Sequence, residues 1–370
     1  MQLCITDNKA SKERKSMEDN NFSPTTKIQR RYYRWFLLSL YSTLVISCQT
    51  IATLLGRLYY VKHGKSKWMG TLVQVGGFPV LLPYYCISSS TPKYSHKNKL
   101  MLAFIYVTLG IVESLACYLD SMGLAYLPLS TFALVTSSRL VFNAFFSFFL
   151  SSMKFTPYII NSLVLLTIST TLIAFQPESG HHVPGLISAI AGSAAYGFYI
   201  SLIQLALVKV LKRNTTMRVL IDVTTYGSLI STCITLVGLF SSGEWRKLHE
   251  DMERFEMGKG SYLLTLAFTA INWQLFHVGC LGLIFEVSSL FSNAISVLNV
   301  PLVPILAVFI FHDKMHGIKA ISLVLAIWGI VSYFYQTFVD DDDWDSNAIN
   351  KNNADDDHLL KSSTLEESNA

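Results

Sequence analysis

Long apolar runs separated by short polar breaks dominate the chain. A helix needs about 20 mostly apolar residues to cross a bilayer. By that measure the sequence predicts an all-α polytopic membrane protein with ten transmembrane helices. The predicted spans are residues 36–58, 68–87, 100–122, 127–150, 155–175, 183–208, 219–240, 262–285, 287–311 and 317–338.

The ten spans divide into two sets of five. The fourth span ends in FFLSSMKFT and the ninth in FIFHDKMHG, and a shift of about 160 residues superposes Lys154 on Lys314. Because five is odd, the second set would enter the membrane from the opposite side. We therefore predict two inverted five-helix repeats, residues 35–175 and 183–338, with a substrate site at their interface. Chance similarity of two apolar helices is the alternative.

Composition agrees with a membrane protein. Only 15% of the 370 residues are charged and 51% are hydrophobic, whereas soluble domains carry about a quarter charged residues. The basic tail at residues 1–34 and the acidic tail at 339–370 are expected to be disordered. The distribution of Lys and Arg between loops favours cytosolic termini, and it gives no reason to expect a nucleic-acid partner.

Motifs for enzymes, ATP-driven pumps and metal sites are absent from the sequence. HExxH, GxSxG, Walker and GxGxxG patterns do not occur, and the six cysteines have no CxxC spacing. We expect no cofactor, no metal and no enzymatic activity. In the C-terminal tail, Asp355 followed by Leu359 and Leu360 resembles a sorting signal, a minor hint of an adaptor partner.

Ionisable side chains lie inside the third and fourth predicted spans, where charge is costly and usually functional. Glu113 and Asp120 share one face of the third span, and Thr136, Arg139 and Asn143 share one face of the fourth. A polar stripe on an apolar helix is typical of a cavity lining.

Depth along the two helices suggests a pairing of these charges. From a turn near Leu124, Glu113 lies roughly 16 Å and Arg139 roughly 22 Å deep, and the arginine leans back toward its helix N-terminus. An ion pair between Glu113 and Arg139 is geometrically plausible, and Asp120 is expected near the outer interface. Either Glu113 binds or relays a proton while Arg139 holds substrate, or the pair is structural.

Amides and aromatic rings in other spans suit a flat heterocycle, which needs hydrogen bonds to ring nitrogens and a face for stacking. Taken singly, such residues more commonly pack helices or form interface belts. Pro301 and Pro304 are expected to kink the ninth span. The predicted substrate-binding residues are Gln74, Thr136, Arg139, Asn143, Tyr196, Trp273, Gln274 and Asn293, and the predicted proton-coupling residues are Glu113 and Asp120.

Five segments carry a resemblance to known proteins. They are RLYYVKHGKSKWMGTLVQVGGFPVLLP (57–83), YLPLSTFAL (126–134), FNAFFSFFLSSMKFTPYIINSLVLLT (142–167), GLIFEVSSLFSNAIS (282–296) and PILAVFIFHDKMHGIKAISLVLAIWGIVSYFYQ (304–336). They resemble the plant purine permeases of the drug/metabolite transporter superfamily. The resemblance implies ten spans, cytosolic termini and proton-coupled uptake of purines, cytokinins or alkaloids. We expect the plasma membrane, with a vacuolar or other endomembrane as the alternative.

Two positions depart from the family pattern. Ala116 and Cys117 stand where members often have Asp-Asn, and Arg139 stands where members commonly have Gln. Either the substrate carries negative charge, as for an organic-anion transporter, or Glu113 neutralises Arg139 and purine recognition survives. An alternative from another class is a membrane receptor or scaffold that no longer transports.

Overall fold

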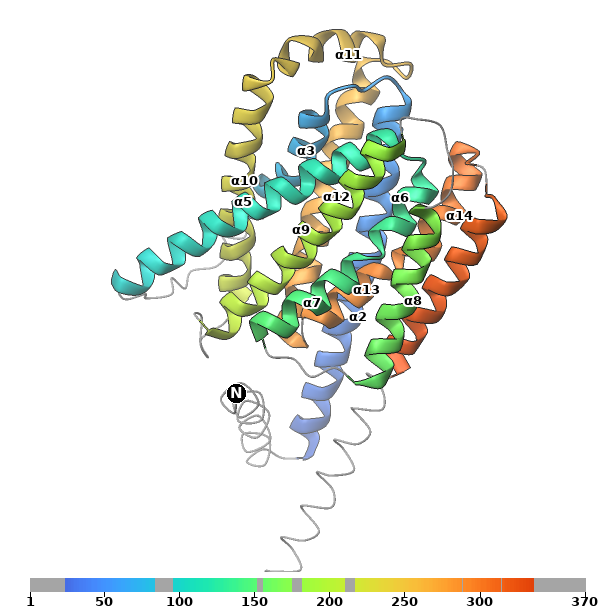
Figure 1. Ribbon diagram of the computed structural model, residues 1–370. Coiled ribbons are helices and arrows are strands. Elements are labelled where there is room, and N and C mark those ends of the chain that lie inside the picture. The colour runs from blue at the N-terminus through green and yellow to red at the C-terminus, as the bar shows by residue number, and fades with distance from the viewer. Residues whose placement is uncertain are drawn as a thin grey trace, which may run out of the picture.

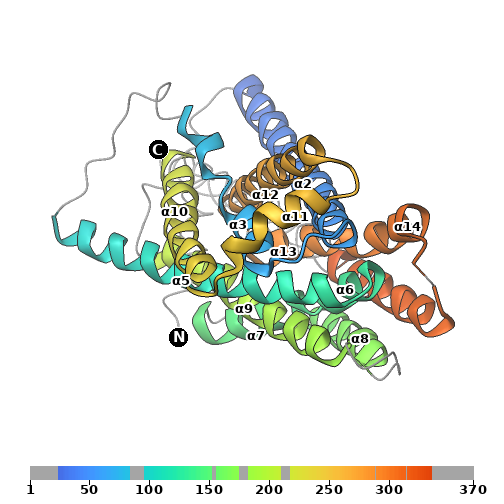
Figure 2. The same ribbon diagram turned by 90° about the horizontal axis from the view of Figure 1, so that it is seen from above.

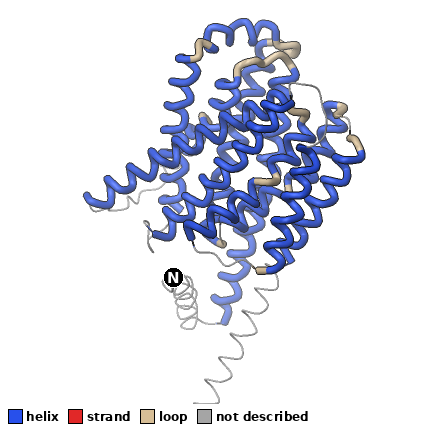
Figure 3. Tube along the Cα trace, viewed as in Figure 1, coloured by secondary structure: helices blue, strands red, loops and turns tan. Residues whose placement is uncertain are grey.

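The computed structural model describes residues 24–83, 96–151, 156–174, 182–209, 217–287, 289–313 and 315–335. All regular secondary structure in these residues is helical (Figure 3). Eight helices are long and apolar enough to cross a membrane, and a shorter apolar helix covers Pro157–Ile173. The chain is therefore an all-α polytopic membrane protein, as predicted, while the count of ten spans stays a prediction.

The helices pack together as a bundle (Figure 1). Two short elements, η2 and α11, cover one end of the bundle, at the top of Figure 1. The elements are α2 (Pro24–Val61), α3 (Lys67–Val75), η1 (Phe78–Leu81), α5 (His96–Tyr126), α6 (Leu129–Thr136), α7 (Arg139–Ser151), α8 (Pro157–Ala174), α9 (His182–Lys209), α10 (Met217–Ser241), η2 (Glu244–Lys247), α11 (Leu248–Arg254), α12 (Lys259–Glu286), α13 (Ser289–Val297), α14 (Asn299–Phe311) and a last helix at Gly317–Tyr335.

Helices distant in sequence pack side by side. α2 lies along α12, and α9 packs against both α5 and α7. Seen from above, α13 lies near the middle, with α2 and α12 on one side and α7 and α9 on the other (Figure 2). Helices from both predicted repeats therefore surround the centre of the bundle.

The fourth predicted span is broken, whereas the sequence predicted a continuous helix. α6 ends at Thr136 and α7 begins at Arg139. Between them the Ser138 amide donates to the Val135 carbonyl at 3.1 Å, and the Ser137 and Ser138 hydroxyls bond to carbonyls three residues earlier, each at 2.7 Å. Serine hydroxyls that compete for helix carbonyls favour such a tight 3₁₀-type turn, which is a frequent hinge.

The ninth predicted span is also broken, but before its prolines and not at them. α13 ends at Val297, α14 begins at Asn299, and the Leu298 amide donates to the carbonyl three residues earlier at 3.1 Å. Pro301 has no N–H for the Val297 carbonyl, so the regular hydrogen-bond pattern ends there. The two breaks lie about 160 residues apart, the spacing of the predicted repeat. The repeat itself stays a prediction.

Other boundaries differ from the predictions. The second span is interrupted at Gly76 and Gly77. A Cβ on Gly77 would lie 2.4 Å from the Ala270 carbonyl oxygen, so a glycine here lets α12 approach closely. α2 begins at Pro24, inside the segment predicted to be a disordered tail, because proline suits a first helical position. The end of α12 at Glu286 agrees with the predicted turn.

Several predicted features lie outside the described residues. They include residues 1–23 of the N-terminal tail, the C-terminal tail with its sorting signal, and the lysine pair of the repeat. Within the described residues, Cys48, Cys117, Cys233 and Cys280 are free thiols.

Candidate functional site

A small cavity lies where the two broken helices meet. Thr136 and Arg139 line it on either side of the first break, and Val297 and Asn299 on either side of the second. The other lining residues are Gln49, Thr53, Gln74, Asp120, Leu124, Phe132, Ala133, Trp273, Ser296, Val300 and Val303.

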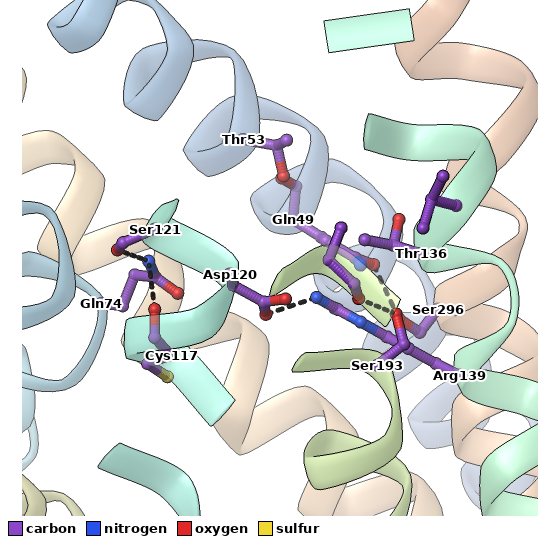
Figure 4. Close-up of polar contacts among 12 residues, drawn as sticks. Gln49, Thr53, Gln74, Cys117, Asp120, Ser121, Thr136, Arg139, Ser193 and Ser296 are labelled. Atoms are coloured by element: carbon purple, nitrogen blue, oxygen red, sulfur yellow. Dashed lines mark hydrogen bonds and ion pairs between the residues drawn. The ribbon is translucent and has the colours of Figure 1, made fainter. Parts of the chain in front are cut away.

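A buried ion pair between Arg139 and Asp120 forms part of the cavity wall (Figure 4). The two residues are only 4% and 6% exposed. The Arg139 guanidinium also lies over the Tyr196 ring, 4.7 Å from its centroid, a cation–π contact from α9. Charge is thus neutralised locally, and the guanidinium is fixed in orientation by contacts from α5 and α9.

The plausible pairing of Arg139 with Glu113 is wrong, because Arg139 pairs with Asp120. α5 continues to Tyr126 and α6 begins at Leu129, so the turn lies at residues 127–128. Asp120 is then about 11 Å and the Arg139 backbone about 17 Å from the turn. The long arginine side chain reaches back toward its helix N-terminus over the remaining distance, which brings its head to the depth of Asp120.

Glu113 lies outside the cavity and faces a different partner. Its carboxylate oxygen Oε1 is 3.4 Å from Nδ1 of His277 on α12, and both residues are buried. Tyr199 of α9 is the other close polar neighbour. His277 was not among the residues predicted for the site. The available signal was a lone histidine one helical turn after Trp273 in a mostly apolar span.

The predicted amides serve two purposes. Gln74 lines the cavity and donates to the Ser121 hydroxyl at 2.8 Å and to the Cys117 carbonyl at 3.4 Å (Figure 4). Asn293 of α13 donates to the Arg139 carbonyl at 3.0 Å. Asn293 therefore connects α13 to the first break from outside the cavity.

Three other predicted site residues do not line the cavity. Asn143 donates to the Ser289 carbonyl at 3.3 Å and accepts from the Ser201 hydroxyl at 2.8 Å, which joins α7 to α13 and α9. The buried Gln274 side chain has no hydrogen-bond partner and packs near Gly77. Tyr196 reaches the site only through the Arg139 guanidinium. These residues position the wall and do not form it.

Four polar lining residues were absent from the predicted site. The Ser296 hydroxyl donates to Gln49 at 2.9 Å, and the Asn299 amide oxygen accepts from Thr50 at 2.7 Å. Gln49 and Thr53 stand four residues apart in the first span, a spacing that places them on one helix face. The lining residues outside the predicted site are Gln49, Thr53, Ser296 and Asn299.

Comparison with known proteins gives one consistent result. The family described as "Purine nucleobase transmembrane transport" matches residues 36–343, which include every residue that lines the cavity. The chain is 52% identical to "Probable purine permease 10" and 50% identical to "Purine permease 21", both of Arabidopsis thaliana. In each case the match covers 84% of this chain and 83% of the relative. "Probable purine permease 8" of the same plant is 45% identical over the same shares.

Proposed function

The chain belongs to the purine nucleobase transporter family, and from this membership we propose that it takes up a purine or purine derivative by alternating access, driven by protons. The family makes it a multi-pass membrane transporter of purine-like compounds and not an enzyme. Its particular substrate, its coupling ion and its mechanism are the parts proposed here.

The observation that carries the proposal is the chemistry of the cavity wall. Trp273 and Phe132 offer aromatic faces, and Gln74, Asp120 and Arg139 offer donors and acceptors at the edges. A purine needs this combination, a flat face for stacking and a rim of ring nitrogens for hydrogen bonds. Adenine-like bases, cytokinins and flat alkaloids all present it.

The Asp120–Arg139 pair bears on the charge of the substrate. An organic anion would need a free cation in the cavity wall, but the Arg139 guanidinium is already neutralised by the Asp120 carboxylate. Displacing that carboxylate would leave a buried unpaired charge, which is strongly unfavourable. A neutral heterocycle fits the wall without this cost, so we favour it over the anionic substrate.

The two helix breaks supply the proposed movement. Each break lies directly beside lining residues, and a short 3₁₀-type turn between helical segments is a plausible pivot. Tilting α6 against α7, and α13 against α14, would change which end of the cavity is open while the site stays in place.

We propose the plasma membrane as the location of the protein, with both termini in the cytosol. Reporters fused to each terminus would test this placement.

A competition screen in vesicles with an acidic external medium tests the substrate class. Labelled adenine is offered with an excess of purines, cytokinins, alkaloids or organic anions. We expect neutral purines and purine derivatives to inhibit uptake and organic anions to have no effect. Inhibition by anions alone would establish the anionic alternative, and binding of adenine without accumulation would establish a receptor.

A further inference from the structure

We propose that Glu113 and His277 form a proton-binding site separate from the substrate cavity, and that three helices transmit movement between the two sites. The inference rests on the proposed proton-coupled function and names the site that couples it. Neither residue lines the substrate cavity, and the two are 2% and 5% exposed.

The hydrogen bonding of the pair is incomplete. By geometry neither Glu113 carboxylate oxygen nor His277 Nδ1 makes a full hydrogen bond in the described residues, although Nδ1 lies 3.4 Å from Oε1 and the Tyr199 side chain is close to the carboxylate. A buried carboxylate without a countercharge is strongly unfavourable. An added proton, held on either group, would supply the missing donor.

The proton balance of the step is simple. One proton enters from water and occupies the space between the carboxylate oxygen and Nδ1, where it converts two acceptors into a donor and an acceptor. The net charge of the pair rises by one, and no other bond forms or breaks. In the conformation described here the pair is sealed from solvent, so the proton leaves only after the surrounding helices separate.

Three helices each contribute one residue to the cavity region and one to the proton site. On α12, Trp273 lines the cavity and His277 follows one turn later, with ring centroids 6.3 Å apart. On α5, the corresponding residues are Asp120 and Glu113, two turns apart. A substrate that shifts these helices at the cavity therefore also changes the separation of Glu113 from His277.

The third connection runs through α9. Tyr196 lies under the Arg139 guanidinium, and Tyr199 lies close to Glu113. The two rings are 6.0 Å apart between centroids. Rearrangement of Arg139 around a substrate would move Tyr196, and through the same helix it would move Tyr199 against the Glu113 carboxylate.

The other groups around the pair are few. Cys117 of α5 and the backbone at Gly227 of α10 lie near Glu113. On α12, Cys280 follows His277 by three residues. Tyr41 and Cys48 of α2 belong to the same buried apolar cluster as Cys280.

The charged residues on these helices lie farther away or are already paired. Asp222 of α10 stands five residues before Gly227, more than a helical turn away. Asp120 and Arg139 neutralise each other two turns along α5. Glu113 and His277 are thus the pair positioned to exchange a proton.

The test uses the full-length protein in proteoliposomes and two assays. Exchange of labelled for unlabelled adenine at equal pH needs no net proton movement, whereas accumulation against a gradient does. We compare the wild type with Glu113→Gln, His277→Gln and the control Ser114→Ala. Ser114 adjoins Glu113 on α5, is buried, and bonds only to its own helix at Ile111.

We expect Glu113→Gln and His277→Gln to keep exchange within about twofold and to lose at least tenfold in proton-driven accumulation, while Ser114→Ala keeps both. Infrared difference spectra across a pH jump should show a carboxyl band that Glu113→Gln removes and His277→Gln shifts.

Accumulation at the wild-type level in both the Glu113→Gln and His277→Gln variants would overturn the inference. Exchange without any proton-driven accumulation by the wild type would instead contradict the proposed proton coupling.

Discussion

Two acidic residues on one helix show how surroundings assign different roles to similar side chains. Asp120 and Glu113 lie seven residues apart on α5 and are both buried. Asp120 is ion-paired with Arg139 in the cavity wall, whereas Glu113 faces the uncompensated Nδ1 of His277 away from it. The first carboxylate has a permanent countercharge, and the second has none.

The difference suggests a division of labour. A carboxylate held by a guanidinium keeps its charge and fixes the shape of the wall. A carboxylate without a countercharge gains or loses a proton at a low free-energy cost when its surroundings change. We therefore assign substrate positioning to the Asp120–Arg139 pair and proton exchange to the Glu113–His277 pair. The following variants are ways to break or sharpen that assignment.

The largest effect is expected from breaking the cavity ion pair. Asp120→Asn leaves the Arg139 guanidinium buried without a countercharge, which should cost about 3–5 kcal/mol of stability. The double variant Asp120→Asn with Arg139→Gln removes both charges and should recover most of that loss. Thermal unfolding in detergent measures both. A single variant as stable as the wild type would show that water already screens the pair.

Retained folding in the double variant allows a specificity test. The double variant places a neutral amide in the cavity wall at position 139. We therefore expect its competition profile across nucleobases to differ from that of the wild type. An unchanged profile, measured as inhibition constants for adenine and related bases, would assign the arginine a purely structural role.

A smaller effect is expected from removing the aromatic face of the cavity. Trp273→Ala should raise the KM for adenine by roughly 2- to 10-fold, because aromatic stacking contributes about 0.5–1.5 kcal/mol. Trp328→Ala is the matched control, since Trp328 is 66% exposed on the last helix. Initial uptake rates over a range of adenine concentrations give the KM of each variant. Equal changes in both variants would remove Trp273 from the site.

Glu113→Gln should change stability much less than Asp120→Asn. If Glu113 holds a proton in this conformation, glutamine reproduces its shape and its neutrality, and the unfolding free energy should change by less than about 1 kcal/mol. Thermal unfolding of the two variants side by side tests the contrast directly. A loss as large as that of Asp120→Asn would mean that Glu113 is a charged structural group.

The smallest effect is expected at the exposed end of the bundle. A hydrogen bond from Lys62 lowers the pKa of Glu256 outside the spans. A carboxyl with a lowered folded-state pKa stabilises the fold above its unfolded pKa, and this contribution disappears as the pH falls through the folded value. Lys62→Gln should therefore lower the unfolding temperature slightly at pH 7 and not at pH 3. An equal loss at both pH values would exclude the ion pair as its cause.

The sequence predicted the class of fold because it depends on apolar run length, a local quantity. It also identified Arg139, Thr136, Gln74 and Trp273, which line the cavity. These are polar or aromatic residues in apolar surroundings, and such exceptions are visible without a structure.

The pairing of charges could not be predicted because it depends on the end of α5 and on the break before Arg139. A shift of about three residues in the turn moves a helical residue by about 5 Å, enough to exchange Glu113 for Asp120 as the partner. His277 was missed for a related reason. Its role comes from its distance to Glu113 across two helices, which no pattern within α12 records.

Uptake of labelled adenine by wild-type proteoliposomes under an imposed pH gradient, acidic outside, tests the central claim most directly. The account predicts accumulation above the external concentration that collapses when a protonophore removes the gradient. Adenine that only equilibrates across the membrane, or that binds without entering, would contradict proton-coupled purine uptake by this chain.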